Sequence, residues 1–388
     1  MAKIYFYSFF VVIFLWCFGT GYSQMTTDAA ATGISRAFNP AISVNCLFDA
    51  MGTNRNDVLW SEIGLEPGLH YQEICMEMTA NVDVYLQSKV ALSVEEKTDL
   101  GVEEAYASTL RMPIPLILRM GKMLNTFGRH NLLHLHHMAF VERPMILEQV
   151  FGPDLNEMSI EGAYLLPLPW YSDALAGILN GDNPNLFEGS SKGDVAFLAH
   201  WDNLWDVTDE WTVRIGGSYL RGERGLPPPE NMQQPLTNNG GNVHSGVWGA
   251  NIHLKWKPLH RGRYHSFTLQ GEYVNAKVNM NGNSTEPLHG FFIQMLGQFN
   301  IRWFIQARYD WFNRPQELHL LFPAPINFSF NPSEDLQGQR LSFCLAFVPT
   351  EFSAYRLQYN YIDLGGQGEN QIIAQLNITI GSHPAHKY

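Results

Sequence analysis

Residues Arg302–Arg314 read RWFIQARYDWFNR and alternate between apolar and polar side chains. Successive residues of a β-strand point to opposite faces of the sheet. One face of this stretch is apolar and consists of Trp303, Ile305, Ala307, Tyr309 and Trp311. The other face carries Arg302, Gln306, Arg308 and Asp310, with Phe304 as an apolar exception. Because aromatic rings favour membrane interfaces and aliphatic groups favour the hydrocarbon between them, the stretch predicts a strand that crosses a bilayer.

The same alternation recurs along the chain, most clearly in Ser245–Lys257, Ala354–Asp363 and Gln371–Ile380. A strand that spans a membrane in a barrel needs about 9–11 residues. Candidate strands lie near 42–48, 70–79, 84–94, 102–111, 116–121, 157–167, 173–180, 193–202, 211–221, 245–257, 266–275, 290–299, 302–313, 340–348, 352–363 and 370–380. We therefore predict an all-β fold, a single transmembrane antiparallel β-barrel of about 16 strands (roughly 14–18). A secreted β-sandwich also alternates, but it would not usually place tryptophan at both ends of an apolar face.

The composition agrees with a membrane barrel. Aromatic residues make up 13% of the chain and charged residues only 16%, whereas a soluble protein usually carries about 25% charged residues. After residue 23, no run of roughly 18 apolar residues indicates a transmembrane helix. The net charge of -12 argues against nucleic acid as a partner. Cys46, Cys75 and Cys344 remain after the first segment, and three cysteines do not form a disulfide framework.

The N-terminus has the pattern of a secretory signal peptide. Lys3 provides the positive charge, Phe9–Phe18 is apolar, and a segment ending at Ser23 precedes Gln24. We predict that residues 1–23 are a signal peptide and that residues 24–388 form the barrel. An exported barrel of this kind is expected in the cell outer membrane, with the lipid bilayer as its partner.

The connections between the predicted strands alternate between short and long. Periplasmic turns of such barrels are short and extracellular loops are long. When the last strand runs towards the periplasm, Lys122–Asn156 becomes the third outer loop. In general diffusion porins the third loop folds into the barrel and narrows it, so we expect, by analogy, this loop in or over the lumen.

A barrel of about sixteen strands leaves an aqueous channel. Its predicted inward positions carry charges of both signs, and the pore-lining candidates are Arg214, His253, Lys255, Glu272, Arg302, Arg308, Asp310 and Arg356. Such groups either tune the ion preference of a pore or simply solvate its wall. We predict a porin-like channel for passive or weakly selective uptake of small hydrophilic solutes or ions. A homotrimer is one assembly that this architecture allows.

Histidines are the candidates for a metal site. His134, His136 and His137 lie close together in the long loop, and His383 and His386 lie in the tail. Imidazole is a common ligand for zinc, copper and nickel, so Zn²⁺ is the candidate cofactor. The alternative is that these histidines bond to the backbone or pack on the wall. A metal- or substrate-binding receptor with an occluded lumen is therefore a second functional hypothesis.

We expect no catalytic residues, although one segment matches a catalytic motif. Gly189-Ser190-Ser191-Lys192-Gly193 matches Gly-x-Ser-x-Gly, but an esterase elbow needs a strand before it and a helix after it. A polar loop precedes this segment and a predicted strand follows it, so we interpret it as a turn. A barrel enzyme is the third hypothesis.

Several short motifs resemble a known family as a set. They are Asn39–Val44, Thr79–Tyr85, Val102–Tyr106, Arg119–Lys122, Phe127-Gly128, His134–His136, Phe140–Pro144 and Gly381–Tyr388. Together they resemble a bacterial outer-membrane family labelled zinc-regulated TonB-dependent outer membrane receptor, and Leu116–Gly128 is also similar to the phosphate-selective porins. The resemblance implies an outer-membrane barrel, a link to zinc, and His134, His136, His383 and His386 as family positions. Since such transporters have 22 strands and a plug, we interpret this shorter chain as a passive channel.

Overall fold

The computed structural model describes residues 40–55, 58–60, 67–96, 98–187, 194–224, 243–280, 283–284, 286–318 and 334–381. The predicted signal peptide, the Gly189–Gly193 segment, and the tail histidines His383 and His386 lie outside the described residues. Residues Ala37–Tyr388 belong to one compact unit. The described part of this unit is an antiparallel β-barrel.

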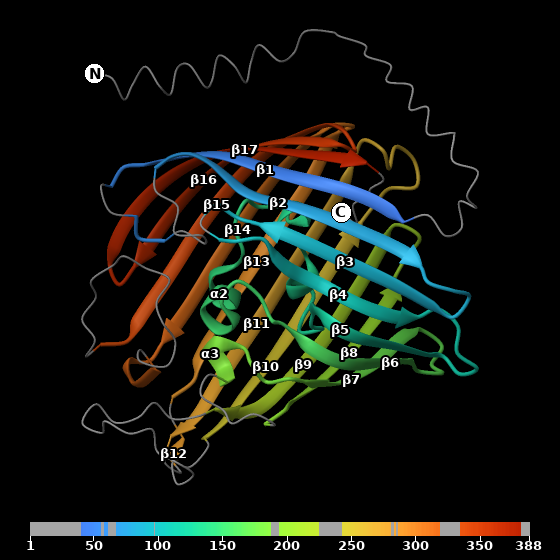
Figure 1. Ribbon diagram of the computed structural model, residues 1–388. Coiled ribbons are helices and arrows are strands. Elements are labelled where there is room, and N and C mark those ends of the chain that lie inside the picture. The colour runs from blue at the N-terminus through green and yellow to red at the C-terminus, as the bar shows by residue number, and fades with distance from the viewer. Residues whose placement is uncertain are drawn as a thin grey trace. The chain divides into compact units, whose positions relative to one another are not determined.

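Sixteen strands form the wall of the barrel, and each is hydrogen-bonded to antiparallel neighbours on both sides (Figure 1). They are β1 (Ala41–Thr53), β2 (Gly68–Asn81), β3 (Leu86–Val94), β4 (Gly101–Thr109), β5 (Leu116–Leu124), β6 (Asn156–Leu165), β7 (Tyr171–Leu179), β8 (Ala196–Asp206), β9 (Trp211–Arg224), β10 (Val243–Trp256), β11 (Ser266–Met280), β13 (Leu288–Asn300), β14 (Trp303–Arg314), β15 (Leu336–Thr350), β16 (Ser353–Leu364) and β17 (Gln367–Gly381). The two-residue strand β12 (Asn283–Ser284) pairs with the end of β11.

The ring closes where β1 pairs with β17, from Ser43 opposite Gly381 to Thr53 opposite Gln371. Every one of the sixteen predicted strand ranges overlaps one of these strands, so the predicted barrel is confirmed. The β-sandwich alternative is wrong, because two packed sheets leave open edges and this sheet pairs its first strand with its last.

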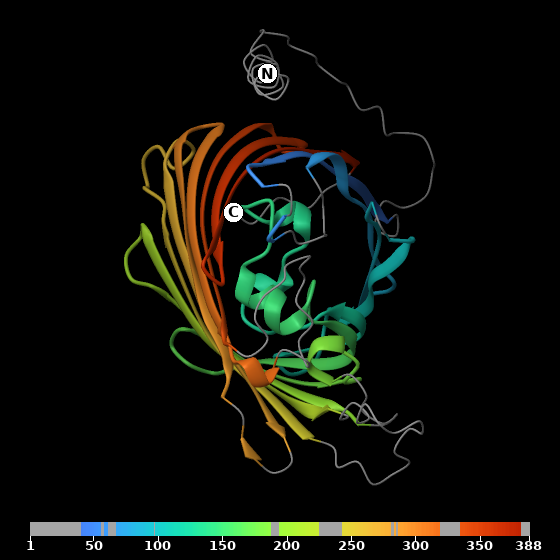
Figure 2. The same cartoon turned by 90° about the vertical axis from the view of Figure 1, so that its left-hand side faces the viewer.

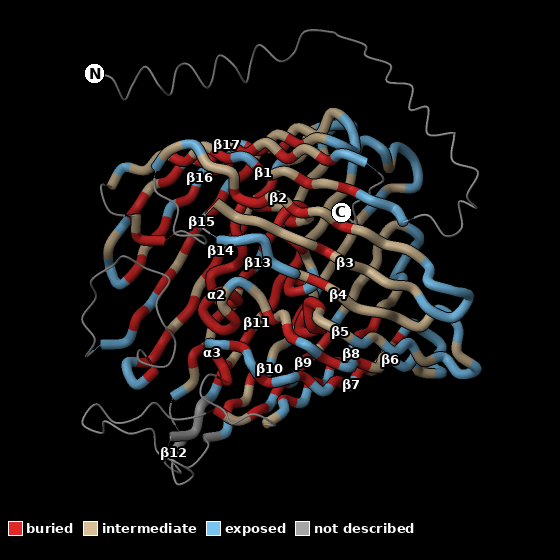
Figure 3. The backbone as a smooth tube through the Cα atoms, viewed as in Figure 1, coloured by how far each residue is buried: buried red, intermediate tan, exposed pale blue. Residues whose placement is uncertain are grey.

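Burial alternates along the strands. In β14, Ile305 is 61% exposed on the outer face, whereas Arg308 and Asp310 point inward and are almost completely buried. In β10, Trp248 and Ile252 are exposed and Asn251 between them is buried. Figure 3 shows buried and exposed positions interspersed along the strands of the wall. The predicted apolar rows therefore lie on the outside of the barrel, and the polar rows lie on the inside.

The two ends of the barrel differ in the lengths of their connections. One end, here called the short-turn end, carries connections such as 207–210, 301–302 and 351–352. The opposite end, here called the long-loop end, carries connections such as 125–155 and 180–195. This alternation follows the expected rule that periplasmic turns are short and extracellular loops are long.

Residues 125–155, called the luminal loop below, lie inside the ring of strands (Figure 2). The luminal loop contains η1 (His130–Leu132), η2 (Leu135–His137) and α2 (Met145–Phe151), and every residue of α2 is buried. The expected third loop within the lumen is therefore confirmed. Among the described residues, no helix is long and apolar enough to cross a membrane.

The luminal loop supplies an apolar core that the wall alone would lack. The rings of Phe127 and Phe151 meet at 4.9 Å between centroids, and the same cluster includes the inward wall residues Phe292 and Phe312. The short helix α3 (Pro184–Phe187) adds Phe187 to it. A further short helix, η3 (Gln316–Leu318), follows β14. Because a sixteen-stranded wall is too wide for its own side chains to fill, the loop packs part of the interior instead.

Candidate functional site

Carboxylates of the barrel wall hold the first part of the luminal loop by its backbone. Glu272 Oε1 accepts hydrogen bonds from the backbone N–H groups of Arg129 and His130, each at 2.8 Å. Glu161 Oε1 accepts the backbone N–H of Thr126 at 3.1 Å. These bonds satisfy buried donors that a loop inside a barrel would otherwise leave unpaired. Glu272, a pore-lining candidate, therefore fastens the loop.

A buried charge network holds the middle of the luminal loop against β14 and β15. Asp310 Oδ2 accepts from Arg308 Nε at 3.0 Å and from Arg340 Nε at 3.1 Å. Arg340 Nη1 also donates to Glu142 Oε2 at 3.1 Å, and Arg308 Nη1 donates to the Glu142 carbonyl at 2.8 Å. Both arginines and Asp310 are at most 1% exposed. The network fixes the loop rather than presenting charge to a passing solute.

Near the short-turn end, side chains of the wall also bind the luminal loop. One of them is a further arginine, and the others are neutral amides. Arg356 Nη2 donates to the Met138 carbonyl at 2.8 Å. Asn377 Nδ2 donates to the His136 carbonyl at 3.0 Å, and the backbone N–H of Val141 donates to Gln358 Oε1 at 2.9 Å. Polar side chains from several strands thus fix successive peptide groups of one loop.

His134 joins the luminal loop to the opposite side of the barrel, where β2, β3 and β4 lie. Its Nδ1 is 2.8 Å from Glu103 Oε1, and its Nε2 is 2.8 Å from Glu104 Oε2. Lys89 Nζ lies 2.9 Å from the same Nε2. Burial lowers the pKa of His134, but the hydrogen bonds to the two glutamates prevail and raise it to about 10. Each ring nitrogen of His134 thus lies within hydrogen-bond distance of a carboxylate oxygen.

The neighbouring histidines are also buried or half-buried. The His134 and His136 rings stack at 5.5 Å between centroids, and His136 and His137 lie 4.2 Å apart by the same measure. His136 Nδ1 lies 3.6 Å from Glu73 Oε2. The three loop histidines predicted as metal ligands are thus together, although no position is described for the two tail histidines.

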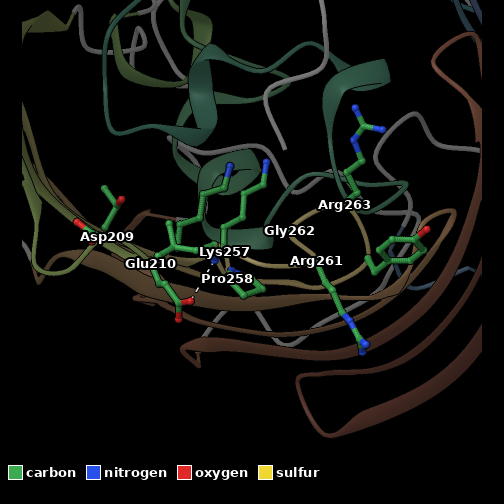
Figure 4. A pocket seen from close by; sticks show the side chains of 11 residues that line it. Asp209, Glu210, Lys257, Pro258, Arg261, Gly262 and Arg263 are labelled. Carbon is green, nitrogen blue, oxygen red and sulfur yellow. Dashed lines mark hydrogen bonds between the residues drawn. The ribbon is translucent and has the colours of Figure 1, made fainter.

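A basic cavity lies at the short-turn end (Figure 4). It has a volume of about 620 Å³ and lies between the β8–β9 and β10–β11 turns. Its charged lining residues are Lys255, Lys257, Arg261, Arg263, Asp209 and Glu210. Glu210 accepts hydrogen bonds from Trp256 Nε1 and the Leu259 backbone at 3.2 and 3.0 Å, so its carboxylate is turned towards these donors. Positive charge therefore predominates in this cavity.

Several known proteins are similar to this chain in sequence or in structure. No family model matches the chain. An uncharacterized protein of Aquifex aeolicus (strain VF5) is 27% identical over 402 residues, covering 91% of this chain and 81% of that protein. An anion-selective porin from Comamonas acidovorans is similar in structure, with a TM-score of 0.58 and 8% identity over 88% of this chain and 100% of that chain.

Two further solved structures agree with this result. OprB of Pseudomonas putida gives a TM-score of 0.57 at 12% identity, over 88% of this chain and 94% of that chain. The trimer form of OmpT, an outer membrane protein of Vibrio cholerae, gives a TM-score of 0.57 at 11% identity, over 89% of this chain and 100% of that chain. The chain has the porin fold. Sixteen strands do not make the 22-stranded wall of a TonB-dependent transporter, so the receptor label of the resembled family gains no support.

Within this porin fold, the predicted pore-lining residues fall into three groups. Arg308, Asp310, Glu272 and Arg356 are buried in contacts with the luminal loop. Arg214 forms an ion pair with the buried carboxylate of Asp202. His253 and Lys255 are partly exposed on the inner side of β10.

Arg302 differs from these because it precedes β14 and lies exposed in the short turn. Its carbonyl accepts the backbone N–H of Val348 at 2.8 Å. The strand begins at Trp303, one residue later than the alternation suggested, so Arg302 lies outside β14. Its role in lining the pore stays a prediction.

The sequence interpretation also missed residues that the porin fold brings to the site. Lys257, Arg261 and Arg263 all occur in the single segment KPLHRGR, so their charge density was visible, although their place in a cavity was not. Arg340 gave no comparable signal, and neither did its contact with Glu142. They lie 198 positions apart and meet only because the third loop turns into the lumen.

Proposed function

We propose that this protein is a passive outer-membrane channel for small hydrophilic solutes, with a preference for anions. The observation that carries the proposal is the basic cavity beside a lumen narrowed by a tethered loop. Four basic and two acidic side chains line that cavity. Fixed charge at a narrow passage raises the local concentration of ions of opposite sign, which sets ion preference. The Comamonas acidovorans porin, which is similar in structure, is itself anion-selective.

The charge above the cavity supports the same preference. Arg129, from the luminal loop, is half-buried. Burial lowers its pKa, the positive charge of Arg214 lowers it further, and the carboxylates of Asp202 and Glu272 act in the opposite direction. An anion that enters from the cavity would therefore meet Arg129 at the level of the loop, whereas Arg214 is already paired with Asp202.

The test is a bilayer recording under a salt gradient. Lys255→Gln/Lys257→Gln should move the reversal potential towards cation preference, because the double substitution removes two positive charges from the cavity. Lys277→Gln is the matched control, since Lys277 is exposed on the outer face of β11, near the long-loop end. An unchanged reversal potential in the double variant would refute the anion preference, and absence of conductance in folded wild type would refute the channel.

A receptor with an occluded lumen is the second candidate, and one observation favours it. The luminal loop is bonded to both sides of the barrel, through His134 on one side and Glu142 on the other. A loop held this way could block the lumen completely. Measured conductance in wild type separates the two candidates. The zinc link and the homotrimer remain proposals, and the mass of the detergent-solubilised protein, corrected for detergent, tests the trimer.

A further inference from the structure

A thiol, an imidazole and a carboxylate meet where the luminal loop contacts β2 and β4. Cys75 Sγ, a Glu103 oxygen and a His134 ring nitrogen all lie within 4.8 Å of one another. The Cys75 thiol donates to Glu103 Oε2 at 3.5 Å, while His134 Nδ1 donates to Glu103 Oε1 at 2.8 Å. Cys75 is completely buried and His134 is 3% exposed. Two protons thus converge on one carboxylate.

A β-bulge creates this arrangement. Ala91 of β3 pairs with Glu104, but the next residue, Leu92, pairs with Val102, so Glu103 has no partner in the ladder. Neighbouring residues of a regular strand point to opposite faces. The bulge instead allows both glutamates to reach the interior, one on each nitrogen of His134. Bulges of this kind re-aim side chains and are frequent beside functional sites.

Glu104 and Lys89 complete the surroundings of the imidazole. Glu104 Oε2 is 2.8 Å from His134 Nε2, and Lys89 Nζ is 2.6 Å from the same carboxylate. Lys89 Nζ also lies 3.0 Å from Glu77 Oε1. The ammonium group therefore occupies the Nε2 side of the ring, where a second cation would be repelled. On the Nδ1 side, Glu103 is paired with the imidazole itself.

A cavity leads to this side of the cluster. It has a volume of about 210 Å³ and lies by the luminal loop and the β3–β4 connection. Its charged lining residues are Glu73, Glu95, Glu103, Asp154, Lys122 and Arg143, so acidic groups outnumber basic ones. Glu73 is 2% exposed, and its Oε2 has no hydrogen-bond partner. A buried carboxylate oxygen without a hydrogen bond is costly, and Glu73 lines the same cavity as Glu103.

We propose that Cys75, Glu103 and His134 Nδ1 bind one divalent cation of the zinc class, with Glu73 as the fourth ligand. Thiolate, imidazole and carboxylate are the ligands of tetrahedral zinc sites. Binding releases two protons, one from the Cys75 thiol and one from His134 Nδ1, and forms the metal–sulfur and metal–nitrogen bonds in their place. Glu104 then accepts the remaining N–H at Nε2, which fixes the tautomer that presents Nδ1 to the metal.

This site goes beyond the proposed channel and does not depend on it. It also reduces the predicted histidine set, because His134 is the one histidine in the ligand group. The metal would link the luminal loop to β2 and β4, on the side of the barrel away from the Arg308–Asp310–Arg340 network. A bound ion would thus hold the loop in place.

The experiment uses Co²⁺ as the probe on the full-length folded protein, followed by displacement with Zn²⁺. A cobalt–thiolate bond gives a charge-transfer absorption that histidine and carboxylate ligands alone do not give. We expect one Co²⁺ per chain with this band, and its loss on adding one equivalent of Zn²⁺. The Cys75→Ser, Glu103→Gln and His134→Ala variants should each lose the band or weaken Co²⁺ binding at least tenfold.

Matched variants test whether the band belongs to this site. Cys344→Ser removes another buried cysteine, on β15, and should leave the band intact. His136→Ala should also retain it, although it alters the adjacent ring. A cooperative heat-unfolding transition in the absence of metal establishes that each variant is folded before titration. A wild type without the thiolate band, or a band that survives in Cys75→Ser, would overturn the proposal. Conductance is recorded in a separate experiment. The metal-binding result can therefore be interpreted even if the protein does not conduct ions.

Discussion

The Asp310→Asn substitution should loosen the luminal loop. Asp310 Oδ2 accepts from both Arg308 and Arg340 at about the same distance, 3.0 and 3.1 Å, and Oδ1 accepts the Met145 backbone N–H at 3.2 Å. An amide has no negative charge, so Asn leaves two buried guanidinium groups with Glu142 as the remaining acid of the network. We expect the two arginines to repel each other and displace the loop.

The size of this effect follows from burial. Removing one partner of a buried ion pair costs about 3–5 kcal/mol, because the other charge stays in a poorly solvated place. At ~1.4 kcal/mol for each factor of ten, the lower limit corresponds to a more than ~100-fold change in the equilibrium between the seated and the released loop. Other anchors, such as Glu272 and His134, limit how far the released loop moves.

Single-channel recording and loop proteolysis measure the result. Asp310→Asn should give a larger or noisier open-state current and faster cleavage within 125–155 than wild type. Asp363→Asn is the control, because Asp363 accepts one long hydrogen bond of 3.4 Å from Gln339 on β15. Identical current, cleavage rate and unfolding temperature in Asp310→Asn and wild type would refute the view that this network holds the loop.

Three further predictions test the fold and the loop. Ile305→Lys places a charge on the outer face of β14 and should lower the free energy of unfolding in a bilayer by about 2–4 kcal/mol; equal denaturation midpoints would show that lipid does not contact this row. Gly121→Ala should destabilise the barrel in a thermal melt, since Gly121 has φ +139° and a Cβ there would lie 2.2 Å from the Ala105 carbonyl oxygen; a wild-type melting temperature would contradict this. Burial holds the pKa of His130 well below its ordinary value, so the unfolded chain binds a proton that the folded chain does not, and stability should fall as pH drops below about 6.5. His130→Gln should reduce that acid sensitivity in urea titrations, and an unchanged pH slope would count against the assignment.

The sequence determined the wall of the barrel. Alternation in segments such as Arg302–Arg314 identifies both the strands and their outer face. Side chains alternate between the two faces of a strand, so every second residue contacts lipid. The length of Lys122–Asn156 marked the unusual loop. These features are local, so a single chain displays them without knowledge of which strands are neighbours.

Only the tertiary structure decided what the inward side chains do. Arg308 is predicted from its strand to line the pore, yet it is buried against Asp310 and the Glu142 carbonyl. Regular alternation would turn Glu103 away from the face that Glu104 occupies, yet a bulge directs it towards His134. Both outcomes depend on contacts between segments far apart in sequence and on a ladder irregularity that alternation does not encode. At these points the lumen is filled by the luminal loop rather than by water. The contacts between the loop and the wall form only when the barrel closes around the loop.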